Sequence, residues 1–186
     1  MIVSGKSYRS IWYDEENNKV KIIDQTKLPF LFVVESLCSV DEVYHAISTM
    51  KVRGAPLIGA AATYGIAIGL QVDSGDDILL SICQKLKKAR PTAVNLAWAV
   101  DFMYDNLKIC TSDSRCDRAF ELAARLCDED VEVNRSIGEY GFEIIKDIYS
   151  KKQRTVNILT HCNAGWLATV DWGTALAPIY LAHKMD

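Results

Sequence analysis

Residues 55–72 have the sequence APLIGAAATYGIAIGLQV, which is eighteen residues without a charged side chain. That length reaches the lower limit for a membrane-spanning helix. Alanine, glycine, threonine and glutamine make the stretch only weakly hydrophobic, however, and small residues also allow soluble helices to pack closely. We therefore expect a helix packed in the core of a folded domain, and no membrane partner.

The residues before this stretch predict strands followed by a helix. Residues 7–24 alternate apolar and polar side chains around the polar turn EENN, as a β-hairpin does. Residues 28–35 (LPFLFVVE) then predict a third short strand. Ser39 and Glu42 form a capping box for a helix that runs through Met50.

The residues after this stretch predict helices. The SGDD sequence at 74–77 is a helix start, and residues 92–110 have the apolar spacing of an amphipathic helix. Residues 113–149 form one very long helical stretch, in which Gly138 and Gly141 permit either a kink or a division into two helices.

A different pattern begins at residue 155. Residues 155–160 (TVNILT) are short, β-branched and apolar on both sides, which is typical of a strand in a parallel sheet. Such a strand needs neighbours, and the earlier strands are half-polar hairpin material. We therefore predict an α+β fold: a domain at 1–150 with a small antiparallel sheet and a helical bundle, and at 151–186 the first βα unit of an incomplete Rossmann-like domain.

Composition excludes several classes of function. The chain has 186 residues with a net charge of −3 and no basic cluster interleaved with aromatic residues, so nucleic acid is not expected as a partner. Six cysteines without a C-x-x-C pair and three scattered histidines give no zinc pattern, so no metal is expected. The N-terminal sequence has no secretory signal pattern, which makes the cytoplasm the expected location.

The first candidate site is at Arg53 and Gly54, directly before the apolar helix, whose start is marked by Pro56. Backbone N–H groups at a helix N-terminus, a glycine that permits close approach and a guanidinium together describe a phosphate site. The alternative is that the small residues only allow tight packing and that Arg53 is an ordinary surface residue.

The second candidate repeats this design. Arg90 is followed by Pro91 and Thr92, which are expected to start the next apolar helix. Two arginines at the beginnings of apolar helices could hold one anionic substrate from two directions.

The third candidate is Cys162 in the sequence THCNAGW, where the predicted parallel strand ends and a helix is expected near Gly165 and Trp166. Ligands bind at this edge of open α/β sheets, and a helix N-terminus favours the reactive form of a thiol. The alternative is an inert buried cysteine. His161 is adjacent, but along a strand its side chain would point to the opposite face, so a Cys–His pair is not expected.

Four segments carry a resemblance to a known family: VRGAPLIGAAATYG, RPTAVNLAWA, NRSIGEYG and ILTHCNAGWLATVDWGTALAPIYLAH. Together they resemble methylthioribose-1-phosphate isomerase, which is related to the regulatory subunits of initiation factor 2B. The resemblance implies an isomerase that converts 5-methylthioribose 1-phosphate to 5-methylthioribulose 1-phosphate in methionine salvage, without a cofactor. It also implies that Cys162 is the catalytic thiol and that Arg53, Gly54, Ala55 and Arg90 bind the sugar phosphate.

The family pattern continues beyond what this chain contains. Family members are considerably longer, and their catalytic aspartate stands in a GADR-like motif that is absent here. We therefore expect little activity from this chain alone, and either a homo-oligomer or a complementing C-terminal chain as partner. Two alternatives remain: a non-catalytic regulatory module like the initiation factor subunits, and an isomerase of ribose 1,5-bisphosphate.

Overall fold

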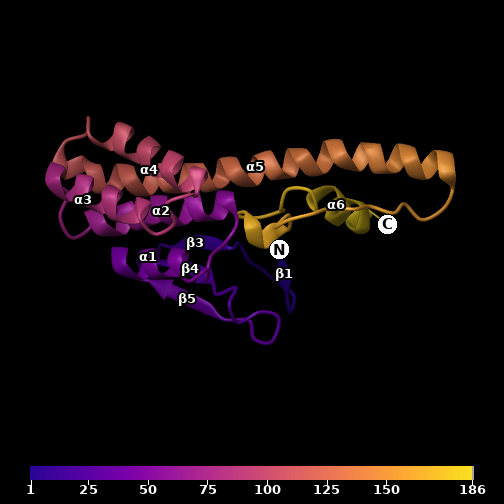
Figure 1. Cartoon of the computed structure of the whole chain (residues 1–186), viewed down its shortest axis with the longest axis horizontal. Coiled ribbons are helices and arrows are strands. Elements are labelled where there is room, and N and C mark those ends of the chain that lie inside the picture. Colours follow the sequence, from indigo (N-terminus) through magenta and orange to yellow (C-terminus); the bar gives the residue numbers. More distant parts are fainter. Residues whose placement is uncertain (186) are drawn as a thin grey trace.

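The computed structural model describes residues 1–185, in which a helical layer lies over two small antiparallel sheets (Figure 1). β1 pairs with β2, and β3, β4 and β5 form a second sheet in that order. The strands are β1 (Ile2–Val3), β2 (Lys6–Ser7), β3 (Ile11–Asp14), β4 (Lys19–Ile23) and β5 (Val34–Leu37). The α+β class predicted from the sequence is therefore confirmed.

The described residues contain six α-helices and one 3₁₀ turn. They are α1 (Val40–Ser48), α2 (Ala55–Leu70), α3 (Asp76–Lys87), α4 (Val94–Leu107), α5 (Ser112–Lys152), the turn η1 (Trp166–Ala168) and α6 (Ala177–Met185).

Helix α2 is the centre of the core, as its composition predicts. Every residue from Leu57 to Leu70 is buried, and α2 packs against α1, α3, α4 and α5. Its alanines and glycines allow these four neighbours to approach closely. Among residues 1–185, no helix combines the length and apolarity needed to cross a membrane.

The hairpin is confirmed, with Ile11 opposite Ile22 and Asp14 opposite Lys19 across the EENN turn. The third strand is shorter than expected, because β5 begins only at Val34 and the residues from 28 to 33 form turns and loop. The capping box forms only in part, because Glu42 Oε2 accepts a hydrogen bond from the Cys38 N–H at 2.6 Å rather than from the Ser39 N–H. Ser39 Oγ accepts a hydrogen bond from the Glu42 N–H at 3.2 Å, and α1 follows.

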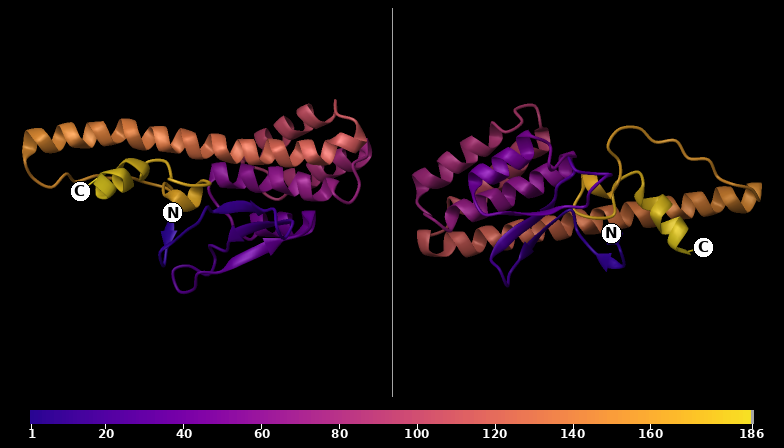
Figure 2. Two further views of the ribbon diagram at one scale, coloured as in Figure 1. Left: turned by 180° about the vertical axis from the view of Figure 1, so that it is seen from behind. Right: turned by 90° about the horizontal axis from the view of Figure 1, so that it is seen from below.

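Helix α5 is continuous over 41 residues, so neither glycine divides it. Gly138 and Gly141 instead make room for α6, which packs along the second half of α5 (Figures 1 and 2). A β-carbon at position 141 would stand 2.3 Å from Pro178 Cγ. The glycines thus serve helix packing.

The parallel strand predicted at 155–160 is not formed in this structure. Among residues 1–185 this segment is exposed except for the half-buried Val156, and it has no strand assignment and no backbone hydrogen bonds to other segments. A strand is defined by its partners, and no described segment lies beside it to pair. The expected helix near Gly165 is likewise only the 3₁₀ turn η1, and α6 begins at Ala177.

Candidate anion and thiol site

The five residues singled out in the sequence line a single cavity of about 910 Å³. They come from three places in the chain: Arg53, Gly54 and Ala55 precede and begin α2, Arg90 lies in the turn before α4, and Cys162 lies in the segment before η1. The tertiary structure therefore brings together segments that are up to 109 positions apart in sequence, from residue 53 to residue 162.

Gly54 is the N-cap of α2 and has a φ of +102°. A β-carbon at this position would stand 2.4 Å from Cα and from the carbonyl oxygen of Ala168. Only glycine fits both the backbone conformation and the contact. The backbone of the segment that carries Cys162 is therefore packed directly on the N-terminus of α2.

Arg90 is half-buried, and it precedes α4 by a longer turn than the sequence predicts. The helix begins at Val94 with Ala93 as N-cap, so Pro91 and Thr92 form part of the turn. Thr92 and Asn95 line the cavity together with Arg90. In the described structure the Arg90 guanidinium has no hydrogen bond or ion pair with another residue.

The cavity has a positive electrostatic character. Its lining within residues 1–185 contains two arginines and no carboxylate. Neither α2 nor α4 has an acidic residue in its first turn or a side-chain cap, whereas α1 and α3 both begin with acidic residues. Uncapped N–H groups and the helix dipoles of α2 and α4 therefore add to the two guanidinium charges, which is an arrangement suited to an anion.

Cys162 is exposed and has a left-handed φ of +72°. This conformation is costly for a residue with a side chain, by about 1 kcal/mol or more. Asn163 beside it also lines the cavity, while His161 does not.

The segment after Cys162 is held in place by hydrogen bonds to distant residues. The Ser10 N–H donates to the Val170 carbonyl at 2.8 Å, and the Val170 N–H donates to Asp130 Oδ2 at 2.8 Å. Burial raises the pKa of Asp130, and the hydrogen bonds from Val170 and Asn134 oppose this shift. Residues 164–170 are thus anchored to both the hairpin and α5.

Residues 51–186 match the model of the Initiation factor 2 subunit family. The chain belongs to this family.

Within the family, two relatives named methylthioribose-1-phosphate isomerase are similar over nearly the whole chain. The one from Escherichia coli is 54% identical over 187 residues, which cover 99% of this chain and 50% of that protein. The one from Acidiphilium cryptum is 51% identical over 184 residues, with 98% and 50% covered. The chain spans about half the length of the curated relatives that it matches.

Two solved structures, one of an isomerase and one of an initiation factor subunit, have this fold. The 5-methylthioribose 1-phosphate isomerase from Pyrococcus horikoshii superposes with a TM-score of 0.83 at 37% identity, covering 97% of this chain and 50% of that one. The translation initiation factor eIF-2B subunit delta from A. fulgidus gives 0.81 at 39%, with 96% and 52% covered. The chain is thus about equally similar in structure to the isomerase and to the initiation factor subunit.

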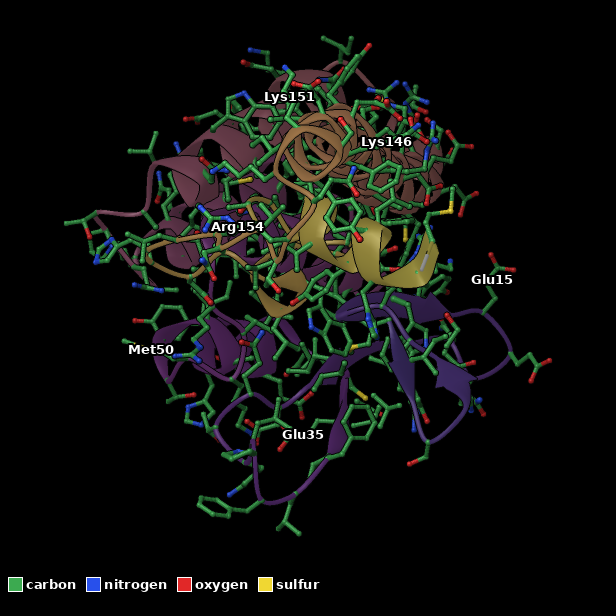
Figure 3. All side chains as sticks on the ribbon, turned by 90° about the vertical axis from the view of Figure 1, so that its right-hand side faces the viewer. Glu15, Glu35, Met50, Lys146, Lys151 and Arg154 are labelled. Atoms are coloured by element: carbon green, nitrogen blue, oxygen red, sulfur yellow. The ribbon has the colours of Figure 1, made fainter. Side chains whose placement is uncertain are left out.

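In the present chain, part of the cavity wall is apolar and consists of Met50, Ile58 and Val94. Figure 3 labels Met50, on the opposite side of that view from Glu15 in the hairpin turn. The cavity thus combines a charged region with a region suited to an uncharged, apolar group.

Sequence reasoning did not identify Gln25, a buried residue that connects parts of the site. It lies just after β4 and has no motif around it that indicates a site.

The described residues also contain no cluster of three or more metal-ligating side chains. A second cavity, of about 790 Å³, is lined by Trp166, Trp172 and Tyr180, but it contains none of the predicted site residues.

Proposed function

We propose that this chain provides the thiol and phosphate-binding half of an aldose–ketose isomerase that converts 5-methylthioribose 1-phosphate to 5-methylthioribulose 1-phosphate in methionine salvage. The observation that carries this proposal is that Arg53, Gly54, Ala55, Arg90 and Cys162 line one cavity. The names of the relatives that are about half identical to this chain support the same reaction.

The substrate phosphate would lie between the N-termini of α2 and α4. Arg53 and Arg90 would approach it from two sides, and free N–H groups such as that of Ala55 would donate to its oxygens. Gly54, as the N-cap of α2 in contact with Ala168, would hold this N-terminus beside the Cys162 segment. These residues bind and orient the sugar and leave its carbon atoms facing Cys162.

The reaction is an isomerisation in which no electrons are gained or lost overall. The bond between C1 and the ring oxygen breaks, the hydrogen on C2 moves to C1, the C2 hydroxyl loses a proton and the former ring oxygen gains one. These transfers require acid and base groups but no redox cofactor. Cys162 would handle one of the protons, and the resemblance assigns an aspartate outside this chain to the others.

The apolar wall favours a methylthio sugar over ribose 1,5-bisphosphate. A methylthio group suits the side chains of Met50, Ile58 and Val94, whereas a second phosphate requires additional cations. Within the described residues that line the cavity, the only cations are the two arginines assigned to the first phosphate.

Part of the proposal is that a C-terminal half completes the site. On α5, Val133, Ile137, Tyr140 and Ile144 lie at helical spacing yet are exposed, with Tyr140 78% exposed. Ile158 and Leu159 in the unpaired segment 155–160 are also exposed. Both surfaces suit a partner that continues a parallel sheet. Residues 151–186 would then begin a Rossmann-like domain, and the completed enzyme would be a cytoplasmic homo-oligomer.

The second candidate function is a non-catalytic regulatory module like the initiation factor subunits. The similarity to the A. fulgidus eIF-2B subunit supports it. Cys162 discriminates, because a module that only binds has no need for an exposed thiol held in a strained conformation beside an anion site.

The test is an isomerase assay with methylthioribose 1-phosphate. We expect the 186-residue polypeptide alone to be nearly inactive, and co-expression with the second half of the Escherichia coli relative to restore conversion. Cys162→Ser should abolish the restored activity, whereas Cys38→Ser, at another exposed cysteine, should retain it. Restored conversion that survives Cys162→Ser would contradict the proposed function.

A further inference from the structure

Gln25 connects three separate parts of the candidate site. It is 6% exposed. Its backbone N–H donates to the Lys51 carbonyl at 2.9 Å, and its side-chain Nε2 donates to the Leu167 carbonyl at 2.6 Å. Its Oε1 accepts a hydrogen bond from Arg53 Nε at 3.4 Å. One buried side chain thus contacts both the arginine before α2 and the segment that follows Cys162.

The contact with Arg53 determines which nitrogens of the guanidinium remain available. Nε is directed toward Gln25, while the described structure gives the two terminal nitrogens no hydrogen-bond partner. A guanidinium fixed at Nε presents its two terminal amino groups in one plane, which matches two oxygens of a phosphate. Fixing the side chain before the anion arrives also reduces the entropy lost on binding.

A glutamine suits this position better than a glutamate. The Leu167 carbonyl requires a donor and Arg53 Nε requires an acceptor, and only a neutral amide supplies both. A carboxylate here would neutralise Arg53 and compete with the anion. It would also place a negative charge against the Leu167 carbonyl in a buried environment.

We propose that Gln25 is a positioning residue, which orients Arg53 toward the anion through Oε1 and holds the Cys162 segment against α2 through Nε2. The proposal deepens the proposed function and rests on it, because the anion is taken to be the substrate phosphate. Gln25 does not line the cavity, so it acts only through its two neighbours.

The experiment titrates the 186-residue chain with inorganic phosphate and follows the amide resonances of Gly54 and Ala55. Gln25→Leu should weaken phosphate binding about tenfold or more, the loss expected for one hydrogen bond to a charged group. In an Arg53→Leu background the same substitution should change the affinity by less than about twofold, because its route to the anion is gone. Gln71→Leu is the matched control, since the Gln71 amide also makes a side-chain hydrogen bond, to Asn18 at 2.8 Å.

A purely structural role for Gln25 would lower the thermal stability but leave the phosphate affinity of the folded chain unchanged, and this result would overturn the proposal. An equal loss of affinity with and without Arg53 would overturn it as well. If Gln25→Leu does not fold, Gln25→Glu provides the same comparison. Its loss of phosphate affinity should be larger in the chain that keeps Arg53 than in the chain with Arg53→Leu. If the native chain binds phosphate and Arg53→Leu weakens binding while neither Gln25 variant does, only the positioning role fails. If the native chain binds no phosphate, the proposed function fails with it.

Discussion

Gly54 and Ala168 are in direct backbone contact, although 114 positions separate them in the sequence. The contact leaves no room for a side chain at position 54, and it places the N-terminus of α2 beside the segment that carries Cys162. This relationship is what makes one cavity out of three separate sequence motifs.

Gly54→Ala should therefore destabilise the fold by about 3 kcal/mol or more, because it combines a positive φ with steric overlap. Chemical denaturation would measure the loss. Gly5→Ala is the control, since Gly5 also has a positive φ, of +79°, but a β-carbon there would have no neighbouring atom within 4 Å. That variant should lose only about 1 kcal/mol. Equal losses for the two variants would show that the contact with Ala168 is unimportant.

Gly141→Ala should disturb the packing of α6, whereas Gly138→Ala should not, although both residues lie in α5. Alanine normally stabilises a helix interior by up to about 1 kcal/mol relative to glycine. At position 138 the new β-carbon would lie 3.4 Å from Ala177, which is close to ordinary contact, whereas at 141 it would lie 2.3 Å from Pro178 Cγ. We expect Gly141→Ala to increase hydrogen exchange throughout α6, and Gly138→Ala to leave it unchanged. Similar exchange in both variants would mean that α6 does not depend on this packing.

The cysteines should differ strongly in their reaction with iodoacetamide at pH 8. Burial raises the pKa of Cys83 and of Cys127 to about 12, so only about one thiol in 10⁴ is ionised at that pH. Cys162 and Cys38 are exposed and should react first. Peptide mass spectrometry with added sugar phosphate should show protection of Cys162 alone. Protection of Cys38 as well would indicate a general effect of the ligand rather than a site at Cys162.

Arg90→Leu should weaken binding of inorganic phosphate about tenfold or more, because a guanidinium hydrogen bond to an anion is lost. The affinity of the native chain should also fall with rising salt concentration. Arg118→Leu, at an exposed arginine that is paired with Glu121 outside the cavity, is the control and should bind normally. Titration calorimetry at two salt concentrations measures both effects. Unchanged affinity in Arg90→Leu would exclude Arg90 from the anion site.

The acid stability of the chain should depend on Asp24, which is fully buried beside Gln25. Burial by itself raises the pKa of Asp24, but the hydrogen bonds from the Thr26 hydroxyl and N–H and the charge of Lys51 outweigh it and hold the pKa below its ordinary value of 3.8. The resulting stabilisation is present above about pH 4 and is lost as the pH falls through the lowered pKa of the folded state.

Thr26→Val should therefore lower the free energy of unfolding at pH 7 by about 1 to 2 kcal/mol, and the difference from the native chain should shrink toward pH 2. Urea denaturation at several pH values measures this trend. Thr49→Val removes a hydroxyl that donates to the His45 carbonyl instead of a carboxylate, so its effect should be nearly independent of pH in the acid range. A pH-independent loss in Thr26→Val would contradict the role given to Asp24.

Local patterns in the sequence were sufficient for most elements of the fold. The N-cap at Ser39, the EENN turn and the buried helix predicted at residues 55–72 each depend on neighbours in the chain, and each of these predictions is confirmed. The candidate site was also found in this way, because an arginine before an uncapped helix start is a local signal.

Other features depend on residues that are distant in the sequence. Residues 155–160 have the composition of a parallel strand, but a strand requires hydrogen-bond partners, and the described residues supply none. The reason for glycine at positions 138 and 141 of α5 likewise lies in α6, which packs on those glycines.

The sequence by itself determined the α+β class, the buried α2 and the identity of the arginines and the thiol, because periodicity, capping and charge are properties of short segments. Only the tertiary structure decided that these groups share one cavity, that Gly54 lies against Ala168 and that Gln25 connects Arg53 to Leu167. Such contacts arise from packing between segments that are far apart in the chain, and no local pattern encodes them.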